Sequence, residues 1–236
     1  MAKSGCLGGN KSVGKSVRRA LGVIFVIIAA TSISVPVQGQ SPDDSLRIYA
    51  VNVVKTTPFR KPFIGYGIYL GKGAVITAAH VIGRWGFLKD PHVLIAGQNL
   101  PAKILKEGSV EQTDLTLLSV DEARLPVSLR LRRNPLCKQP PNVGENVIVV
   151  VPEKTARTQV VSPLLIAPQL RRRFNTLIGD LVAGSGSGVF DAERRCLMGI
   201  ISRKVGKYDY RKEGGFAGYF VPASQIADFI PPEFRF

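Results

Sequence analysis

A serine, a histidine and an aspartate of this chain are candidates for a shared catalytic role, because of their side-chain chemistry and their order along the sequence. Ser185 lies in the glycine-rich stretch 183–190, where glycines alternate with small residues. Glycine beside a nucleophile lets the backbone take positive φ and leaves main-chain N–H groups open to a substrate carbonyl. With His80 and Asp114 upstream, the stretch predicts nucleophilic hydrolysis. Taken alone, it is more typical of a flexible Gly/Ser turn between strands.

His80 and Asp114 each lie at the end of an apolar segment. His80 follows the small and apolar residues 74–79, and a strand end is a stiff place from which to hold a general base. Asp114 precedes the apolar run 115–118, where a carboxylate needs a partner that offsets its lost hydration. An imidazole N–H is such a partner. Taken singly, His80 is also consistent with a structural histidine and Asp114 with a turn cap.

Short apolar segments recur along the chain, punctuated by glycine, proline and polar clusters, and this pattern is typical of an all-β protein. Strands are expected over residues 48–54, 64–70, 74–77, 92–95, 103–106, 115–120, 147–151, 160–166, 189–190, 197–202 and 218–221. A short helix is expected over 224–230, with Ser224 as its N-cap and prolines at its end. Residues 40–46 are polar and suit a linker, and the proline-rich 133–141 suits a crossover between two lobes.

Three motifs together resemble the trypsin/chymotrypsin-like serine proteases. They are Thr-Ala-Ala-His ending at His80, Asp-Leu-Thr-Leu-Leu beginning at Asp114, and Ser-Gly-Ser-Gly-Val-Phe beginning at Ser185. The order His, Asp, Ser is that of this family. The resemblance covers about residues 48–230 and implies a protease domain at 47–236 that is all-β. It would be a double six-stranded β-barrel, the first barrel at about 47–133 and the second at about 142–236, with a short C-terminal helix.

The resemblance also implies roles. Ser185 would be the nucleophile, His80 the general base and then acid, and Asp114 the group that fixes the histidine tautomer. Ser187 is the rival nucleophile. Ser185 gives the family's spacing between the nucleophile and the following strand, whereas from Ser187 this spacing is two residues too short. The oxyanion hole would use the N–H groups of Ala183 and Ser185.

The stretch departs from the family pattern at two positions. The family usually has glycine where Ala183 falls, and a Cβ there could hinder the oxyanion N–H. Gly184 replaces a usual polar or acidic residue, which in animal members pairs with an N-terminus released from a zymogen. The chain therefore resembles bacterial high-temperature-requirement and glutamyl-type proteases, and we expect it to fold directly to its working form.

By the same resemblance, the pocket for the substrate side chain would involve Gly179, Asp180, Ser202 and Arg203. Asp180 would attract a basic side chain, whereas Arg203 with Lys204 would attract an acidic one, and the sequence favours neither. Two cysteines remain in the domain, and an even pair suits an oxidising compartment. Cys137 and Cys196 are close to positions that a disulfide bridges in many family members.

The first 39 residues differ from the rest of the chain. They carry five basic and no acidic residues, and the apolar run 20–37 follows the last basic one. This pattern predicts a cleaved signal peptide, with an uncleaved membrane anchor as the alternative. Either way the domain would be extracytoplasmic, secreted or periplasmic, and it would meet a membrane only if the segment stays attached.

The net charge of +15 falls to +10 without those five basic residues (15 − 5). The basic clusters lack interleaved aromatic residues and a recognition helix, which argues against nucleic acid. An anionic envelope surface is a possible partner beside the protein or peptide substrate. The sequence has no metal-ligand spacing, and no cofactor is expected.

The leading hypothesis is an exported serine endopeptidase that works through an acyl-enzyme. The alternative is a trypsin-fold binding module at the cell envelope, whose oxyanion hole Ala183 impairs. Chaperone-like peptide binding is a weaker third reading, because no C-terminal peptide-binding domain is expected after Phe236.

Overall fold

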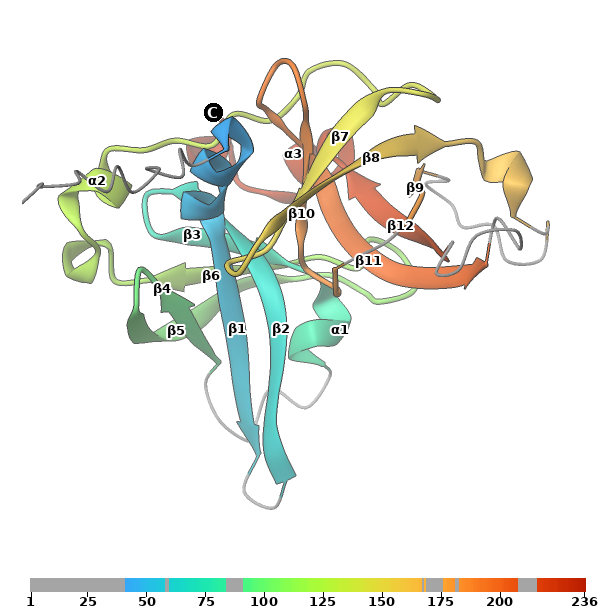
Figure 1. The fold of residues 1–236 in the computed structure, drawn as a ribbon. Helices are drawn as coiled ribbons and strands as arrows, with labels where there is room; N and C mark the ends of the chain where they lie inside the picture. The colour runs from blue at the N-terminus through green and yellow to red at the C-terminus, as the bar shows by residue number, and fades with distance from the viewer. Residues whose placement is uncertain are drawn as a thin grey trace, which may run out of the picture. The chain divides into compact units, whose positions relative to one another are not determined.

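The computed structural model of the chain describes residues 41–57, 60–83, 91–166, 168, 176–180, 183–207 and 216–236 (Figure 1). All of them belong to the unit Gly39–Phe236. The expected export segment, 1–39, lies outside the described residues. Among the described helices, none has the length and apolar character to cross a membrane.

The first six strands form a closed antiparallel barrel. They are β1 (Ala50–Thr57), β2 (Arg60–Gly71), β3 (Ala74–Thr77), β4 (His92–Ile95), β5 (Gln98–Glu107) and β6 (Thr116–Val120), in the order β1-β2-β3-β6-β5-β4. Side chains alternate between the two faces of each strand, so every second residue of β1 points inward. Val51, Val53 and Val75 are among the fully buried residues of this barrel's core.

The other six strands close a second barrel with the same order of connections. They are β7 (Asn146–Val150), β8 (Thr155–Val161), β9 (Leu177–Ile178), β10 (Gly188–Asp191), β11 (Leu197–Lys207) and β12 (Phe216–Pro222), in the order β10-β11-β12-β9-β8-β7. One apolar cluster joins the barrels, with Ile68 and Leu117 from the first packing with Ile148 and Phe190 from the second. The predicted all-β double six-stranded barrel is confirmed.

The C-terminal helix is also confirmed, with one correction. Helix α3 spans Ala223–Phe229, and its N-cap is Pro222 rather than Ser224, without a side-chain hydrogen bond. Pro222 still pairs with Gly199 at the end of β12, and its ring holds φ at −73°, so the helix begins directly after the strand. Within the described part of the chain, the other α-helices are the single turns α1 (Ala79–Ile82) and α2 (Val127–Arg130).

The limits of most strands differ from the expected ones, and β9 was not expected. Two of these differences arise beside 3₁₀ helices. The strand expected over 160–166 is β8, Thr155–Val161, and the residues after it form the 3₁₀ helix η3 (Pro163–Leu165). Ser162 caps that turn by accepting the Leu164 N–H, and proline at its first position cannot donate to a ladder. The strand expected from residue 48 begins at Ala50, because the 3₁₀ helix η1 (Pro42–Tyr49) precedes it. Two further 3₁₀ turns among the described residues are η2 (Glu122–Arg124) and η5 (Pro232–Phe234).

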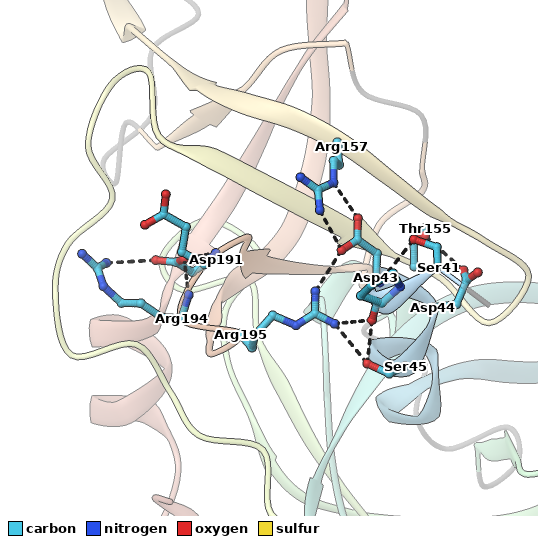
Figure 2. Close-up of polar contacts among 11 residues, drawn as sticks. Ser41, Asp43, Asp44, Ser45, Thr155, Arg157, Asp191, Arg194 and Arg195 are labelled. Carbon is cyan, nitrogen blue, oxygen red and sulfur yellow. Dashed lines mark hydrogen bonds and ion pairs between the residues drawn. The ribbon is translucent and has the colours of Figure 1, made fainter. Parts of the chain in front are cut away.

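Helix η1 also corrects the expected linker at 40–46. Asp43 is only 5% exposed. Its carboxylate accepts hydrogen bonds from Arg157 Nε at 2.6 Å and Arg195 Nη1 at 2.9 Å, both from the second barrel (Figure 2). Tyr49 stacks on Phe190 of β10 with 6.3 Å between ring centroids. The segment therefore docks on the second barrel, which local polarity could not show.

The crossover between the barrels is tied to the second barrel by a disulfide. Cys137 and Cys196 are bonded, with 5.1 Å between their Cα atoms, as the resemblance implied. The Cys137 N–H donates to the Leu197 carbonyl at 3.0 Å. The crossover is thus held against the start of β11.

Candidate active site

Asp114 is the most enclosed polar residue of the predicted triad. It is 1% exposed and takes a left-handed φ of 47° just before β6. Its own N–H donates to the Ser109 carbonyl at 2.8 Å, which fixes the turn 109–114. Aspartate is one of the few residue types that adopts this conformation readily. The turn aims the carboxylate away from solvent and toward helix α1.

His80 lies on α1, the single helical turn that follows β3. Its Nδ1 is 3.0 Å from both carboxylate oxygens of Asp114, and its main-chain N–H donates to Oδ1 at 3.1 Å. A carboxylate can only accept, so Nδ1 carries the proton and Nε2 is left as a base. The imidazole is 31% exposed. The predicted partnership of His80 and Asp114 is present in the structure.

Ser202 on β11 completes the surroundings of Asp114. It is 1% exposed, and its hydroxyl donates to Asp114 Oδ2. The sequence analysis placed Ser202 among the substrate-pocket residues, whereas in the structure its side chain is hydrogen-bonded to Asp114. The contact joins the two barrels, because β11 belongs to the second and Asp114 to the first. No local pattern in the sequence pairs residues 88 apart.

Ser185 lies in a tight turn that leads into β10. The Ser187 N–H donates to the Gly184 carbonyl at 3.3 Å, and Gly186 has a φ of +89°. Positive φ at the third position of such a four-residue turn requires glycine or asparagine. Ser185, the second residue of the turn, is partly exposed, whereas Ser187 is fully buried. The Ser187 hydroxyl donates to the Gly184 carbonyl at 2.7 Å.

Tyr66 of β2 holds this turn against the first barrel. Its N–H donates to the Ser185 carbonyl at 3.1 Å, and its carbonyl accepts the Thr77 hydroxyl at 2.6 Å. A Cβ on Gly186 would lie 1.8 Å from the Tyr66 carbonyl oxygen, so only glycine fits there. Thr77 ends β3, three residues before His80. The serine turn is therefore fastened beside the strand that leads to the histidine.

Sequence reasoning did not select Tyr66 or Thr77. A signal for Tyr66 was available, because Gly65 and Gly67 flank it within a strand, and strand glycines often mark a close approach of other chain segments. Burial raises the pKa of the Tyr66 phenol, and the negative charge of Glu153 adds to this effect. The partial burial of Tyr66 and its proximity to Glu153, which lies between β7 and β8, indicate that the side chain faces the second barrel.

Gly179 and Asp180, two predicted pocket residues, follow the short strand β9. Gly179 is buried, its N–H donates to the Gln159 carbonyl at 3.0 Å, and its own carbonyl accepts the Thr158 hydroxyl at 2.6 Å. Asp180 is exposed and has a left-handed φ of 43°. The backbone at this end of β9 is thus well fixed, and the acidic residue lies at the surface.

Arg203 and Lys204 continue β11 beyond Ser202. Arg203 is half-buried and pairs with Tyr219 of β12, while Lys204 is exposed, with its Nζ 3.3 Å from the ring centroid of Phe216. This end of β11 presents positive charge, in contrast to Asp180. Ala183, the predicted second oxyanion donor, is partly buried against the apolar core of the second barrel.

Potential metal ligands gather at one place among the described residues. The atoms come from Cys137, Asp191 and Cys196. The two sulfurs are bonded to each other, and Asp191 Oδ1 accepts the N–H groups of Glu193 and Arg194 at 2.8 Å. The oxidised pair offers no free thiolate, so this group does not fit a metal ion.

Solved structures share the two-barrel arrangement. The Rv3671c protease from M. tuberculosis, in its active form, aligns with a TM-score of 0.55 at 16% identity, covering 80% of this chain and 82% of that one. Kallikrein-related peptidase 10 in complex with Zn²⁺ aligns with a TM-score of 0.56 at 16% identity, covering 80% and 96%. The chain has the trypsin-like serine protease fold. The MamO protease domain from Magnetospirillum magneticum, with a TM-score of 0.53 at 20% identity, covers 79% of this chain and 97% of its own.

No protein-family model and no curated protein sequence matches the chain. The identities to the solved structures are low, so these likenesses establish the trypsin-like fold alone. The evidence for chemistry comes from the arrangement of His80, Asp114, Ser202 and the Ser185 turn.

Proposed function

We propose that the chain is a serine endopeptidase that hydrolyses peptide bonds through Ser185, His80 and Asp114. The observation that carries this proposal is the contact of His80 Nδ1 with both oxygens of a buried carboxylate, which leaves Nε2 as the basic atom. The trypsin-like fold supports the same reaction class, and it implies a protein or peptide substrate.

The reaction would proceed by two acyl transfers. Ser185 Oγ attacks the substrate carbonyl carbon while His80 Nε2 takes its proton, and the N–H groups of Ala183 and Ser185 donate to the developing oxyanion. His80 then protonates the leaving amine, and the C–N bond breaks to give the acyl-enzyme. Water attacks the ester with His80 again as base, and Ser185 recovers its proton. Asp114 stays ionised and stabilises the imidazolium.

Ser185 is preferred to Ser187 as the nucleophile because of their surroundings. The buried Ser187 hydroxyl is engaged with the Gly184 carbonyl, where it stabilises the turn. Ser185 is partly exposed and lies at the second position of the same turn. Gly179, Asp180 and Arg203 remain the proposed pocket residues, together with the backbone of Ser202.

We further infer that the domain works outside the cytoplasm, either secreted or periplasmic. The basic and then apolar segment 1–39 supports export, and the disulfide suits an oxidising compartment. An anionic envelope surface remains a proposed partner for the basic domain, and its attraction would weaken with salt.

A fluorophosphonate probe tests the nucleophile directly, because it labels an activated serine covalently. The wild-type protein should be labelled, Ser185→Ala should not, and Ser187→Ala should keep its labelling. Labelling that survives in Ser185→Ala but is lost in Ser187→Ala would reverse the assignment. A folded wild-type protein that is neither labelled nor hydrolytic would favour the binding-module alternative.

A further inference from the structure

Tyr66 contacts three consecutive residues of the serine turn. Its N–H donates to the Ser185 carbonyl at 3.1 Å, and its carbonyl fills the space beside Gly186. These two contacts are made by backbone atoms, and any residue except proline could provide them at position 66. The third contact is made by the aromatic ring, which lies against Gly184.

The ring lies close to the place that a side chain at position 184 would take. A Cβ on Gly184 would lie 3.1 Å from Cε2 and 3.3 Å from Cδ2 of Tyr66, closer than ordinary van der Waals contact. The φ of Gly184 is outside the left-handed region, so its backbone conformation suits other residue types. A side chain at position 184 would therefore require the Tyr66 ring to shift by a few tenths of an ångström, without strain in the backbone itself.

We propose that the Tyr66 side chain is a positioning residue that holds Gly184, and through it the Ser185 nucleophile and its oxyanion N–H groups, in the reactive arrangement. The ring occupies the place of the larger residue expected before the serine. It comes from the first barrel, which also carries His80. Packing of the ring therefore sets the position of the nucleophile relative to its base, across the junction of the barrels.

The composition of the serine turn makes its conformation depend on packing by neighbouring side chains. Glycine at 184 and 186 gives the backbone on both sides of Ser185 more conformational freedom than other residues would. A ring that packs on Gly184 restricts this freedom without a covalent link. Since catalysis by a nucleophile and fixed N–H donors is sensitive to displacements near 1 Å, loss of the ring should slow acylation more than it weakens substrate binding.

The inference rests on the proposed function of Ser185, and the first experiment measures fluorophosphonate acylation rates. Tyr66→Ala should reduce the rate about 10- to 100-fold, whereas Tyr66→Phe, which keeps the ring, should stay within about threefold of wild type. In peptide hydrolysis the loss should appear in kcat, with KM little changed. A wild-type rate in Tyr66→Ala would overturn the proposal.

A double-substitution cycle tests the ring contact itself. Gly184→Ala should slow acylation because its Cβ meets the ring, and combining it with Tyr66→Ala should do less damage than the product of the two single effects. Strictly multiplicative effects would show that the two positions act independently, which would overturn the proposal.

Hydrogen exchange separates this inference from the proposed function. The Gly186 N–H donates to the Ile201 carbonyl at 2.8 Å, and its exchange reports on opening of the turn. Exchange should accelerate in Tyr66→Ala and remain at the wild-type rate in Tyr66→Phe, whether or not the protein reacts with the probe. If the wild-type protein is not labelled but exchange is faster only in Tyr66→Ala, the proposed function is wrong and the positioning role of the ring stands. If exchange in Tyr66→Ala equals that of wild type, the positioning role is wrong.

Discussion

Asp43 and Asp114 are both nearly buried, with exposures of 5% and 1%, but their partners have different chemistry. Asp43 is in the N-terminal helix η1 and binds two guanidinium groups, those of Arg157 and Arg195 (Figure 2). Asp114 is beside the first barrel and binds an imidazole and a hydroxyl group, those of His80 and Ser202.

The difference concerns what the partner can do. An arginine keeps its charge at any ordinary pH, so the Asp43 contacts form a permanent ion pair that joins η1 to the second barrel. Histidine can act as a general base and then as an acid, so under the proposed mechanism Asp114 would stabilise the imidazolium of His80 that forms during each acyl transfer. One residue type at similar burial thus attaches η1 in one region and, under the proposed function, supports proton transfer by His80 in the other.

The largest expected effect separates the two aspartates by activity. Asp114→Asn should reduce kcat about 10⁴-fold, because an amide N–H₂ facing Nδ1 favours the wrong histidine tautomer. The domain should stay folded, since the amide is close in shape to the carboxylate. Steady-state kinetics together with circular dichroism check this expectation. A kcat within tenfold of wild type would contradict the proposed role of Asp114.

The second expected effect concerns stability. Asp43→Asn should lower the free energy of unfolding by about 2 kcal/mol, because two guanidinium groups lose their charged acceptor. The decrease is not larger because the Arg157 side chain is largely exposed, so solvent screens its interaction with Asp43. The kcat should change less than threefold. Urea titration of the two proteins gives the difference.

Asp44→Asn is the matched control for this substitution. The Asp44 side chain is 28% exposed, and its ion pair with Arg47 is 4.0 Å long, so its loss should cost less than about 0.5 kcal/mol. Equal destabilisation by the Asn substitutions at 43 and 44 would show that burial of the Asp43 network has no special energetic role.

The smallest expected effect is the pH dependence of the Asp43 contribution. Hydrogen bonding from Arg157, followed by that from Arg195, lowers the pKa of Asp43 below its ordinary value of 3.8, against the opposing effect of burial. A carboxylate with a lowered pKa contributes stability above the unfolded pKa and loses it as the pH falls through the folded pKa. The stability difference between wild type and Asp43→Asn should therefore be constant from pH 7 to about pH 5 and shrink below about 3.8. A difference that persists fully at pH 2 would mean that the carboxylate charge is not its source.

Much of the fold was predictable because it depends on local patterns. Short apolar segments bounded by glycine and proline predicted most strands, and the six-stranded barrels and the Cys137–Cys196 disulfide followed from the resemblance. The errors lie where local chemistry misled. Most of residues 42–46 are polar, as a linker would be, yet Asp43 and Leu46 are buried. Asp43 can be buried because it is neutralised by Arg157 and Arg195, which lie more than a hundred positions further along the chain.

Local sequence patterns were enough to predict the residues of the proposed triad, their order His80, Asp114 and Ser185, and most of the strands and the glycine-rich turn that carry them. Periodicity and turn chemistry are short-range, so they can be recognised without the fold. The folded structure was needed to show that Ser202 binds Asp114, that Asp43 docks on the second barrel and that the Tyr66 ring lies beside Gly184. Each of these contacts joins residues far apart in the chain, and they meet only after both barrels have closed.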